Sequence, residues 1–248
     1  ALDSGIQSGN RIGFRGTEDL GNGLKASFVL ETGLNVDTGG LSANGSSNDR
    51  GFGRQSFLAL SGNFGTVALG RQYTPQFNLI SKVDPFGAGT VGQINNLYDL
   101  NVRLDNVAAY VSPTFSGFNV VVAYTRSGLR DEAVDNSLDR TVVAISPTYS
   151  NGPVFVGLNY HRIGGDGNGA DTETKVWDLG GTYDFGVVTA HAAYGKRVVE
   201  NNVADNRYWM VGATIPVTEA GKVLTSYTRW KDKETSDKAR QWAVGYTH

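Results

Sequence analysis

The chain has 248 residues, a formal net charge of −2, no cysteine and 33 glycines. This charge gives no overall positive field that would recruit nucleic acid, and the missing cysteines exclude disulfides and thiolate metal sites. No run of about 18 apolar residues is available for a transmembrane helix, but the strands of a membrane barrel need only one lipid-facing side.

The first predicted strand, over residues 9–16, separates its side chains by chemical type. In an extended chain, Arg11 and Arg15 point to one face while Ile12 and Phe14 point to the other. Arginines on the covered face of a soluble sheet would carry a large desolvation cost. A wide membrane barrel avoids that cost, because its inner face is wet and its outer face meets lipid. The pattern therefore favours such a barrel.

The same two-residue periodicity recurs along the chain, and helical periodicity is not sustained over the length of a helix. It appears in segments 24–33, 54–60, 118–126, 154–161, 175–186 and 241–248. In segment 54–60 it predicts that Arg54 points inward and Phe57 points outward. We expect about 13 strands of roughly 8–12 residues, which suits tilted membrane spans of about 9–11 residues.

The connections between these strands alternate in length. Short ones are expected at 21–23, 62–64, 114–117, 151–152 and 184–186, and long polar ones at 36–50, 74–104, 128–138, 164–173, 198–206 and 232–238. Tight turns at one end and long loops at the other are typical of an antiparallel up-and-down transmembrane barrel. Aromatic side chains near the strand ends agree with a girdle at the membrane interface.

The connection over 74–104 is far longer than the common connection of about 4–6 residues, and loops of such length are usually functional or disordered. Its stretch Asp-Pro-Phe-Gly-Ala-Gly, residues 84–89, predicts a turn in which Pro85 fixes φ and the glycines permit unusual dihedrals. The loop also contributes two acids, Asp84 and Asp99.

Other kinds of site find little support. The three histidines, His161, His191 and His248, are scattered and have no metal-site spacing, so neither a metal nor a cofactor is predicted. In loop 164–173, aspartate and asparagine oxygens have a spacing that suits Ca²⁺, but no glutamate completes an EF-hand, and a solvated loop is the alternative. No set of nucleophile, base and orienting residue emerges, so we do not predict an enzyme.

Three stretches, 11–33, 53–73 and 110–118, resemble the Gram-negative general porin family, in the branch typified by Comamonas, Burkholderia and Neisseria porins. The resemblance implies one barrel domain over 1–248, with 16 strands in the complete protein and about 13 in this chain. One strand before the first residue and about two after the last are expected. It also implies a homotrimer in the bacterial outer membrane, surrounded by lipid and lipopolysaccharide, that gives passive diffusion to small hydrophilic solutes.

The resemblance also implies that loop 74–104 folds into the lumen and narrows it. Arg11, Arg54 and Arg103, with Arg15 nearby, are the expected basic cluster at the constriction, and they face the loop acids Asp84 and Asp99. Charged rings at a constriction select ions, so the excess of arginine predicts a preference for anions.

Two further hypotheses concern the subunit contact and the exact kind of channel. Arg71 shares the parity of outward residues, where lipid would penalise an arginine. The resemblance implies that strands near the amino end form the trimer contact, so Arg71 is predicted to lie in the subunit interface and to meet polar or acidic groups of a neighbour, with Asp49 as a candidate partner. A substrate-selective channel for an anionic metabolite, and a plugged structural or adhesive barrel, remain as alternatives to a general porin.

Overall fold

The structure is a computed structural model of one large antiparallel sheet with a helical segment against one face. It describes residues 4–6, 8–42, 50–98, 100–126, 140–165, 172–201 and 203–248. The strands are β1 (Arg11–Gly21), β2 (Leu24–Asn35), β3 (Gly40–Ser42), β4 (Gln55–Gly62), β5 (Gly65–Tyr73), β6 (Arg103–Val111), β7 (Phe118–Thr125), β8 (Arg140–Asn151), β9 (Val154–Gly165), β10 (Thr174–Asp184), β11 (Thr189–Val199), β12 (Ala204–Pro216), β13 (Lys222–Asp232) and β14 (Lys238–Thr247). Between β5 and β6 lie the helix α1 (Pro75–Val83) and the 3₁₀ turn η1 (Ile94–Asn96).

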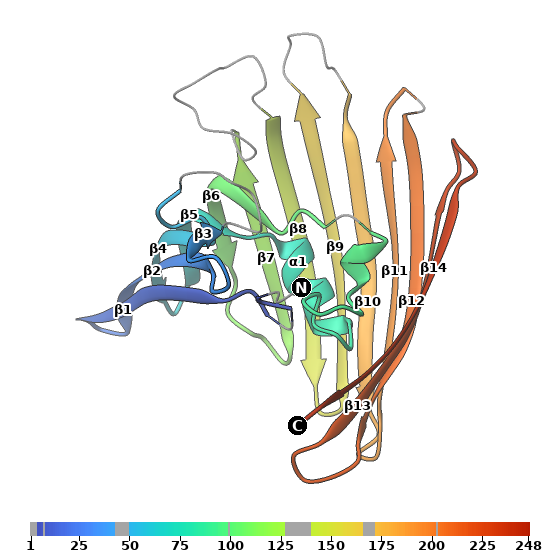
Figure 1. The fold of residues 1–248 in the computed structure, drawn as a ribbon. Helices are drawn as coiled ribbons and strands as arrows, with labels where there is room; N and C mark the ends of the chain where they lie inside the picture. The colour runs from blue at the N-terminus through green and yellow to red at the C-terminus, as the bar shows by residue number, and fades with distance from the viewer. Residues whose placement is uncertain are drawn as a thin grey trace.

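Each strand pairs with its neighbours in chain order, except that the short β3 pairs only with β2. Figure 1 shows the sheet curling around α1, with β8 to β12 forming a tall wall and β1 to β5 a lower one. The predicted up-and-down antiparallel architecture is confirmed, and the predicted 13 strands match the 13 that pair in this order. Within the described residues, no helix has both the length and the apolar character needed to cross a membrane.

Burial alternates along the strands with the predicted period of two. In β8, Val142 and Ala144 are buried on the concave face, whereas Val143 and Ile145 are 47% and 43% exposed on the convex face. The convex face therefore presents apolar side chains outward, while the concave face also carries buried polar ones such as Asn159. This distribution is the reverse of a soluble sheet and is typical of a barrel with lipid outside and water inside.

The hydrophobic core lies between the helical segment that connects β5 to β6 and the inner face of the tall wall, at β10 to β12. Ile80 and Val83 of α1 are completely buried, and they pack in one cluster with Val176, Tyr208 and Met210 of the wall strands. The burial of two aliphatic side chains of this size is worth about 3–6 kcal/mol. The core thus holds the segment against the inner face of the sheet.

Most of the predicted connections are confirmed, but three details differ. The expected long loop at 198–206 is mostly strand, because β11 continues to Val199 and β12 begins at Ala204. A short connection between β12 and β13 was not predicted. Phe57 points inward and not outward, because it pairs with Val29 on the face that also carries Glu31. The prediction for Phe57 is therefore wrong, whereas Arg54, which precedes β4, does line the inner cavity.

Candidate functional site

A cavity of about 770 Å³ separates the segment after β5 from the wall formed by the first strands. Phe77 and Gln93 line it on the segment's side, and Arg11, Arg54 and Arg103 line it on the other. Among the described residues around this cavity, the arginines are the only charged ones. The structure thus brings together the three arginines of the predicted basic cluster.

Arg54 and Arg103 are held by one tyrosine. Tyr73 ends β5 and pairs in register with Arg103, the first residue of β6. Its hydroxyl oxygen accepts hydrogen bonds from Nη2 of Arg54 at 3.0 Å and from Nη2 of Arg103 at 2.9 Å. The Arg103 guanidinium carbon lies 4.5 Å from the centre of the Tyr73 ring, and that ring stacks on Phe77 of α1 at 4.8 Å. The tyrosine therefore connects both guanidinium groups to the helix.

One acid on β2, in the low wall, compensates part of this positive charge. Glu31 of β2 is buried, and its Oε1 accepts a hydrogen bond from Nε of Arg54 at 2.7 Å. Its Oε2 lies 3.9 Å from Nη1 of Arg11, which is the most exposed of the three arginines at 40% of its side chain. Three guanidinium groups and one carboxylate leave a net charge of +2 (3 − 1) beside the cavity.

Arg15 does not join this group. It lies four residues beyond Arg11 on the same face of β1, and it pairs across the strands with Val29. It is exposed and does not line the cavity. Sequence parity placed it on the correct face but could not place it relative to the helical segment.

Asp84 has a different environment from the one predicted. It is 4% exposed, it follows α1, and its carboxylate accepts hydrogen bonds from the backbone N–H groups of Phe86, Ala88 and Ile94, each at 3.0 Å. Burial raises the pKa of Asp84, while these three donors and His191 act in the opposite direction. The carboxylate thus organises the loop's own backbone and does not line the cavity. Asp99 lies outside the described residues.

The start of α1 is fixed by local hydrogen bonds. Thr74 caps the helix, because its Oγ1 accepts from the N–H of Phe77 at 3.0 Å and donates to the carbonyl oxygen of Asn101 at 2.5 Å. Pro75 occupies the first helical turn, where its missing N–H costs nothing. Asn101 lies two residues before the start of β6. The hydrogen bond from Thr74 therefore holds together the two ends of the segment between β5 and β6.

A buried polar network connects α1 to the tall wall, at β9, β10 and β12. The carboxylate of Asp178 on β10 accepts hydrogen bonds from Gln76 of α1 at 3.0 Å, Asn159 of β9 at 3.0 Å and Tyr208 of β12 at 3.1 Å. All four side chains are at most 1% exposed. Because each hydrogen bond to a buried carboxylate offsets part of its desolvation cost, this network stabilises the position of Gln76 and therefore of α1.

Glycines on the wall make room for the segment. A Cβ atom added at Gly157 would lie 2.5 Å from Leu79, one at Gly180 would lie 3.0 Å from Val83, and one at Gly212 would lie 2.6 Å from Pro85. Carbon atoms prefer separations of about 3.5–4.0 Å. The segment therefore approaches the strands more closely than any other residue type would permit at these positions.

Arg71 is bound within its own chain. Its Nη1 lies 2.6 Å from Oδ1 of Asp105 on the adjacent β6, and its Nε donates to the carbonyl oxygen of Gly53 at 2.7 Å. Arg50 binds the same carboxylate at 2.9 Å. Asp105 thus supplies an acid within the same chain, and the contact of Arg71 with a neighbouring subunit stays a prediction. A register shift between β5 and β6 brings Asp105 opposite Arg71. Asp49 lies outside the described residues.

No cluster of three or more metal-ligating side chains occurs within the residues that the structure describes. The candidate Ca²⁺ ligands of loop 164–173 fall in 166–171, outside those residues.

A sheet with an apolar outer face, a polar inner face and a segment packed against that inner face is typical of a channel-forming outer-membrane protein. The comparisons with known proteins agree. The family model described as Gram-negative porin matches residues 1–248, and the chain belongs to this family. The barrel fold class and the outer-membrane location are therefore confirmed, and the family consists of channels, not enzymes.

Individual relatives support this assignment. An outer membrane porin protein of Bordetella pertussis is 32% identical, over 99% of this chain and 74% of the relative. Outer membrane porin protein 32 of Delftia acidovorans is also 32% identical, over 97% of this chain and 70% of the relative. Among solved structures, an anion-selective porin from Comamonas acidovorans superposes with a TM-score of 0.85 at 30% identity, covering 99% of this chain and 75% of that one.

Proposed function

We propose that this porin lets small hydrophilic solutes and ions diffuse passively through its lumen and that it prefers anions over cations. The observation that carries the proposal is the cavity beside the loop, whose only charged lining residues in the described chain are Arg11, Arg54 and Arg103. A similar protein, the porin from Comamonas acidovorans, is named anion-selective. Both points support a passage with a positive potential.

The physical basis is the charge at the narrowest part of a water-filled passage. Walls of low dielectric constant focus the field of fixed charges into the water between them. A net charge of +2 from the arginines and Glu31 therefore concentrates anions and repels cations. Asp84 does not oppose this effect from the cavity's edge, because its carboxylate is turned into the loop.

The whole assembly is also part of the proposal. We place residues 74–104 as a constriction loop inside a single barrel domain over 1–248, and we expect 16 strands in the complete protein. A homotrimer is expected, with lipid and lipopolysaccharide around it. The outward apolar side chains of the low strands, such as Leu58 at 68% and Leu69 at 57% exposed, provide a surface that a second copy would cover. Arg71 at the edge of this surface is expected to lie in the contact.

Ion selectivity in planar bilayers tests the function. The complete porin is reconstituted between solutions of different KCl concentration, and the reversal potential gives the ratio of anion to cation permeability. We expect anion preference in the natural protein and a lower ratio in Arg11→Gln, which removes an exposed charge. The matched control is Glu31→Gln with Arg54→Gln, which removes one charge of each sign and leaves the net charge unchanged.

Three other results are informative. Cation preference in the natural protein would contradict the proposal. Current that saturates and is blocked by one anionic metabolite would show a substrate-selective channel. A reconstituted protein without conductance would show a plugged structural or adhesive barrel.

A further inference from the structure

The hydroxyl group of Tyr73 lies between two of the arginines that line the cavity. Tyr73 ends β5, is half-buried, and lines the cavity together with Arg54 and Arg103. Its oxygen accepts one hydrogen bond from each of them, at 3.0 and 2.9 Å. A neutral hydroxyl is therefore in direct contact with two guanidinium groups at the edge of the proposed passage.

This hydroxyl can bind a further partner only as a donor. A tyrosine hydroxyl has one O–H donor and an oxygen that accepts. The acceptor positions of the oxygen are occupied by Arg54 and Arg103, so another partner must accept the proton of Tyr73. No group in the described parts of the chain accepts that proton. The acceptor must therefore come from the cavity.

The two arginines also make the hydroxyl a stronger donor. Hydrogen bonds in a chain polarise one another, and a bond that involves an ionised group is roughly twice as strong as one between neutral groups. Both groups that donate to Tyr73 are cations, so its O–H bond is more polarised than that of an isolated tyrosine. An anion in the cavity is the acceptor that suits such a donor.

Arg54 offers a second donor close to this hydroxyl. Its Nε donates to Glu31 at 2.7 Å and its Nη2 donates to Tyr73, whereas its Nη1 has no acceptor among the residues that the structure describes. A Cβ atom added at Gly9 would lie only 3.0 Å from this Nη1, so the glycine leaves space beside it. The planar fork of an arginine suits the two oxygens of a carboxylate. A carboxylate in the cavity is thus offered both an O–H and an N–H donor.

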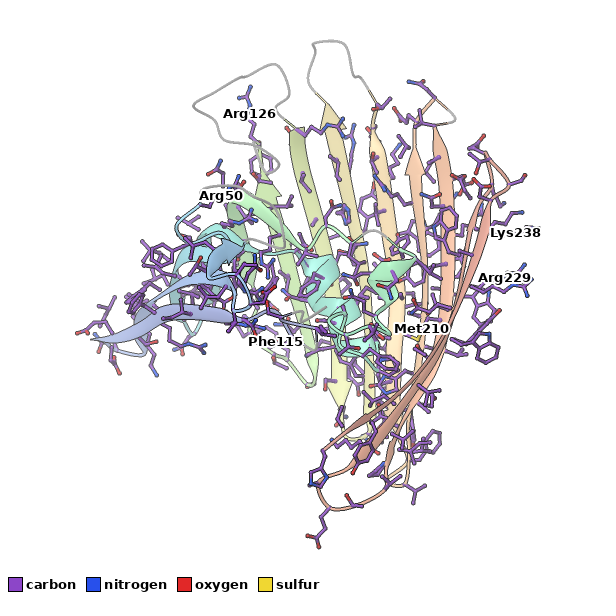
Figure 2. The ribbon with its side chains drawn as sticks, viewed as in Figure 1. Arg50, Phe115, Arg126, Met210, Arg229 and Lys238 are labelled. Carbon is purple, nitrogen blue, oxygen red and sulfur yellow. The ribbon has the colours of Figure 1, made fainter. Side chains whose placement is uncertain are left out.

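Other cations of the chain are arranged differently. Arg11 donates from Nε to the carbonyl oxygen of Gly9 at 3.1 Å and from Nη2 to the hydroxyl of Ser8 at 2.5 Å. Figure 2 shows Arg229 and Lys238 projecting away from the sheet on its outer side. None of these three cations shares a hydroxyl acceptor with a second guanidinium group. Arg11 therefore adds charge to the cavity without adding a polarised hydroxyl.

We propose that the hydroxyl of Tyr73 donates a hydrogen bond to anions in the passage. The porin then favours anions that accept strong hydrogen bonds, such as carboxylates, over weaker acceptors of the same charge. This inference rests on the proposed function, because anions must reach the cavity. The arginines select solutes by charge, and Tyr73 selects among anions of equal charge.

Formate and nitrate are matched probes, because both are small planar oxyanions of the same charge, but formate accepts much stronger hydrogen bonds. The complete porin in a planar bilayer separates potassium formate from potassium nitrate, and the reversal potential gives the ratio of the two permeabilities. Tyr73→Phe removes the hydroxyl and keeps the ring that contacts Phe77 and Arg103. The formate-to-nitrate ratio should fall by about 3- to 10-fold in this variant.

Replacement of Tyr73 by a fluorotyrosine, with the fluorine next to the hydroxyl, separates donation to the solute from support of the arginines. The fluorine makes the O–H a better donor and its oxygen a poorer acceptor, and every other atom remains. At a mildly acidic pH that keeps the hydroxyl protonated, the formate-to-nitrate ratio should rise above that of the natural protein. A ratio that falls or stays unchanged would show that Tyr73 only supports the arginines, and would overturn the proposal.

Two control variants isolate the hydroxyl from other effects. Tyr110→Phe removes an exposed hydroxyl that donates to the carbonyl oxygen of Phe64, and it should keep the natural formate-to-nitrate ratio. Arg11→Gln should lower the anion-to-cation ratio in a KCl gradient. It should keep the formate-to-nitrate ratio, because the two anions carry the same charge.

The inference and the proposed function fail in different measurements. An unchanged formate-to-nitrate ratio in Tyr73→Phe would overturn the inference, even if the natural protein prefers anions in KCl. Cation preference in KCl would contradict the proposed function, whereas a lower formate-to-nitrate ratio in Tyr73→Phe would still support the role of the hydroxyl.

Discussion

Gly180→Ala tests whether the wall determines where the loop lies. The new Cβ would lie 3.0 and 3.1 Å from the two methyl carbons of Val83, a side chain that is completely buried. Contacts this short in a packed core cost about 1–3 kcal/mol. The backbone at Gly180 is extended, so apart from this contact an alanine would stabilise the protein by about 0.4–1 kcal/mol through the unfolded state. A decrease in the free energy of unfolding therefore indicates that the contact with Val83 exists, and an increase indicates that it does not.

Two comparison variants make this measurement specific. Gly164→Ala is the matched control, because a Cβ at that strand position meets no atom within 4 Å, and it should be neutral or stabilising. Val83→Ala alone should cost about 2 kcal/mol. In the double variant of positions 83 and 180 the short contacts disappear, so its cost should fall below the sum of the single costs by about 1–3 kcal/mol.

Urea unfolding of the refolded protein in detergent micelles, followed by tryptophan fluorescence, gives these free energies. Single-channel conductance gives a second measurement, since Gly180→Ala should push Val83 and its helix into the passage and lower the current. Conductance should recover in the double variant. If the two substitutions were additive in stability, or if Gly180→Ala stabilised the protein as much as Gly164→Ala, the wall would not position the loop.

Three further predictions concern the groups that hold the arginines and the loop. Gln76→Ala should destabilise the protein by about 1.5–3 kcal/mol, because Asp178 loses a charged hydrogen bond; an unchanged urea midpoint would contradict this. The folded-state pKa of Asp84 is raised, so the stability of the natural protein should fall as the pH rises from about 4 through that pKa; a pH series of thermal unfolding should be flatter for Asp84→Asn. Asp105→Asn should lower the stability by about 1–3 kcal/mol, because it removes the shared acid of Arg50 and Arg71, whereas an unchanged free energy of unfolding would contradict this role of Asp105.

The architecture was accessible to sequence analysis because it depends on local patterns. A strand's period of two and the difference between tight and long connections are properties of neighbouring residues. They placed the turns near 21–23 and 151–152 correctly. They also predicted that Arg11 and Arg54 point inward, whereas Arg103 was added by the family resemblance, which selected these three among many charged residues.

The partners of these residues depend on register, which local patterns do not contain. Glu31 binds Arg54 only because of how β2 and β4 align. Asp105 meets Arg71 because Asn106, with a φ of 53°, interrupts the regular pairing of β6. An asparagine is among the residues that tolerate this conformation, but many asparagines do not adopt it, so the sequence offered no clear signal.

Asp84 shows a different limit. The stretch Asp-Pro-Phe-Gly correctly predicted a turn, but an acid at the start of a turn can face water or accept from the backbone that follows. The structure shows the second arrangement, with three N–H donors around the carboxylate. The network around Asp178 was missed for a related reason, since its partners are separated by up to 102 residues in the chain.

Tyr73 has a consequence for how this channel can change. Its hydroxyl holds two of the three arginines, and its ring stacks on Phe77 of α1, the helix of the proposed constriction. A substitution that shifts the helix therefore also shifts the charges, and one that moves the charges disturbs the helix. Size selection and charge selection are mechanically linked through one side chain, so related channels that differ in one of these properties are expected to differ in the other as well.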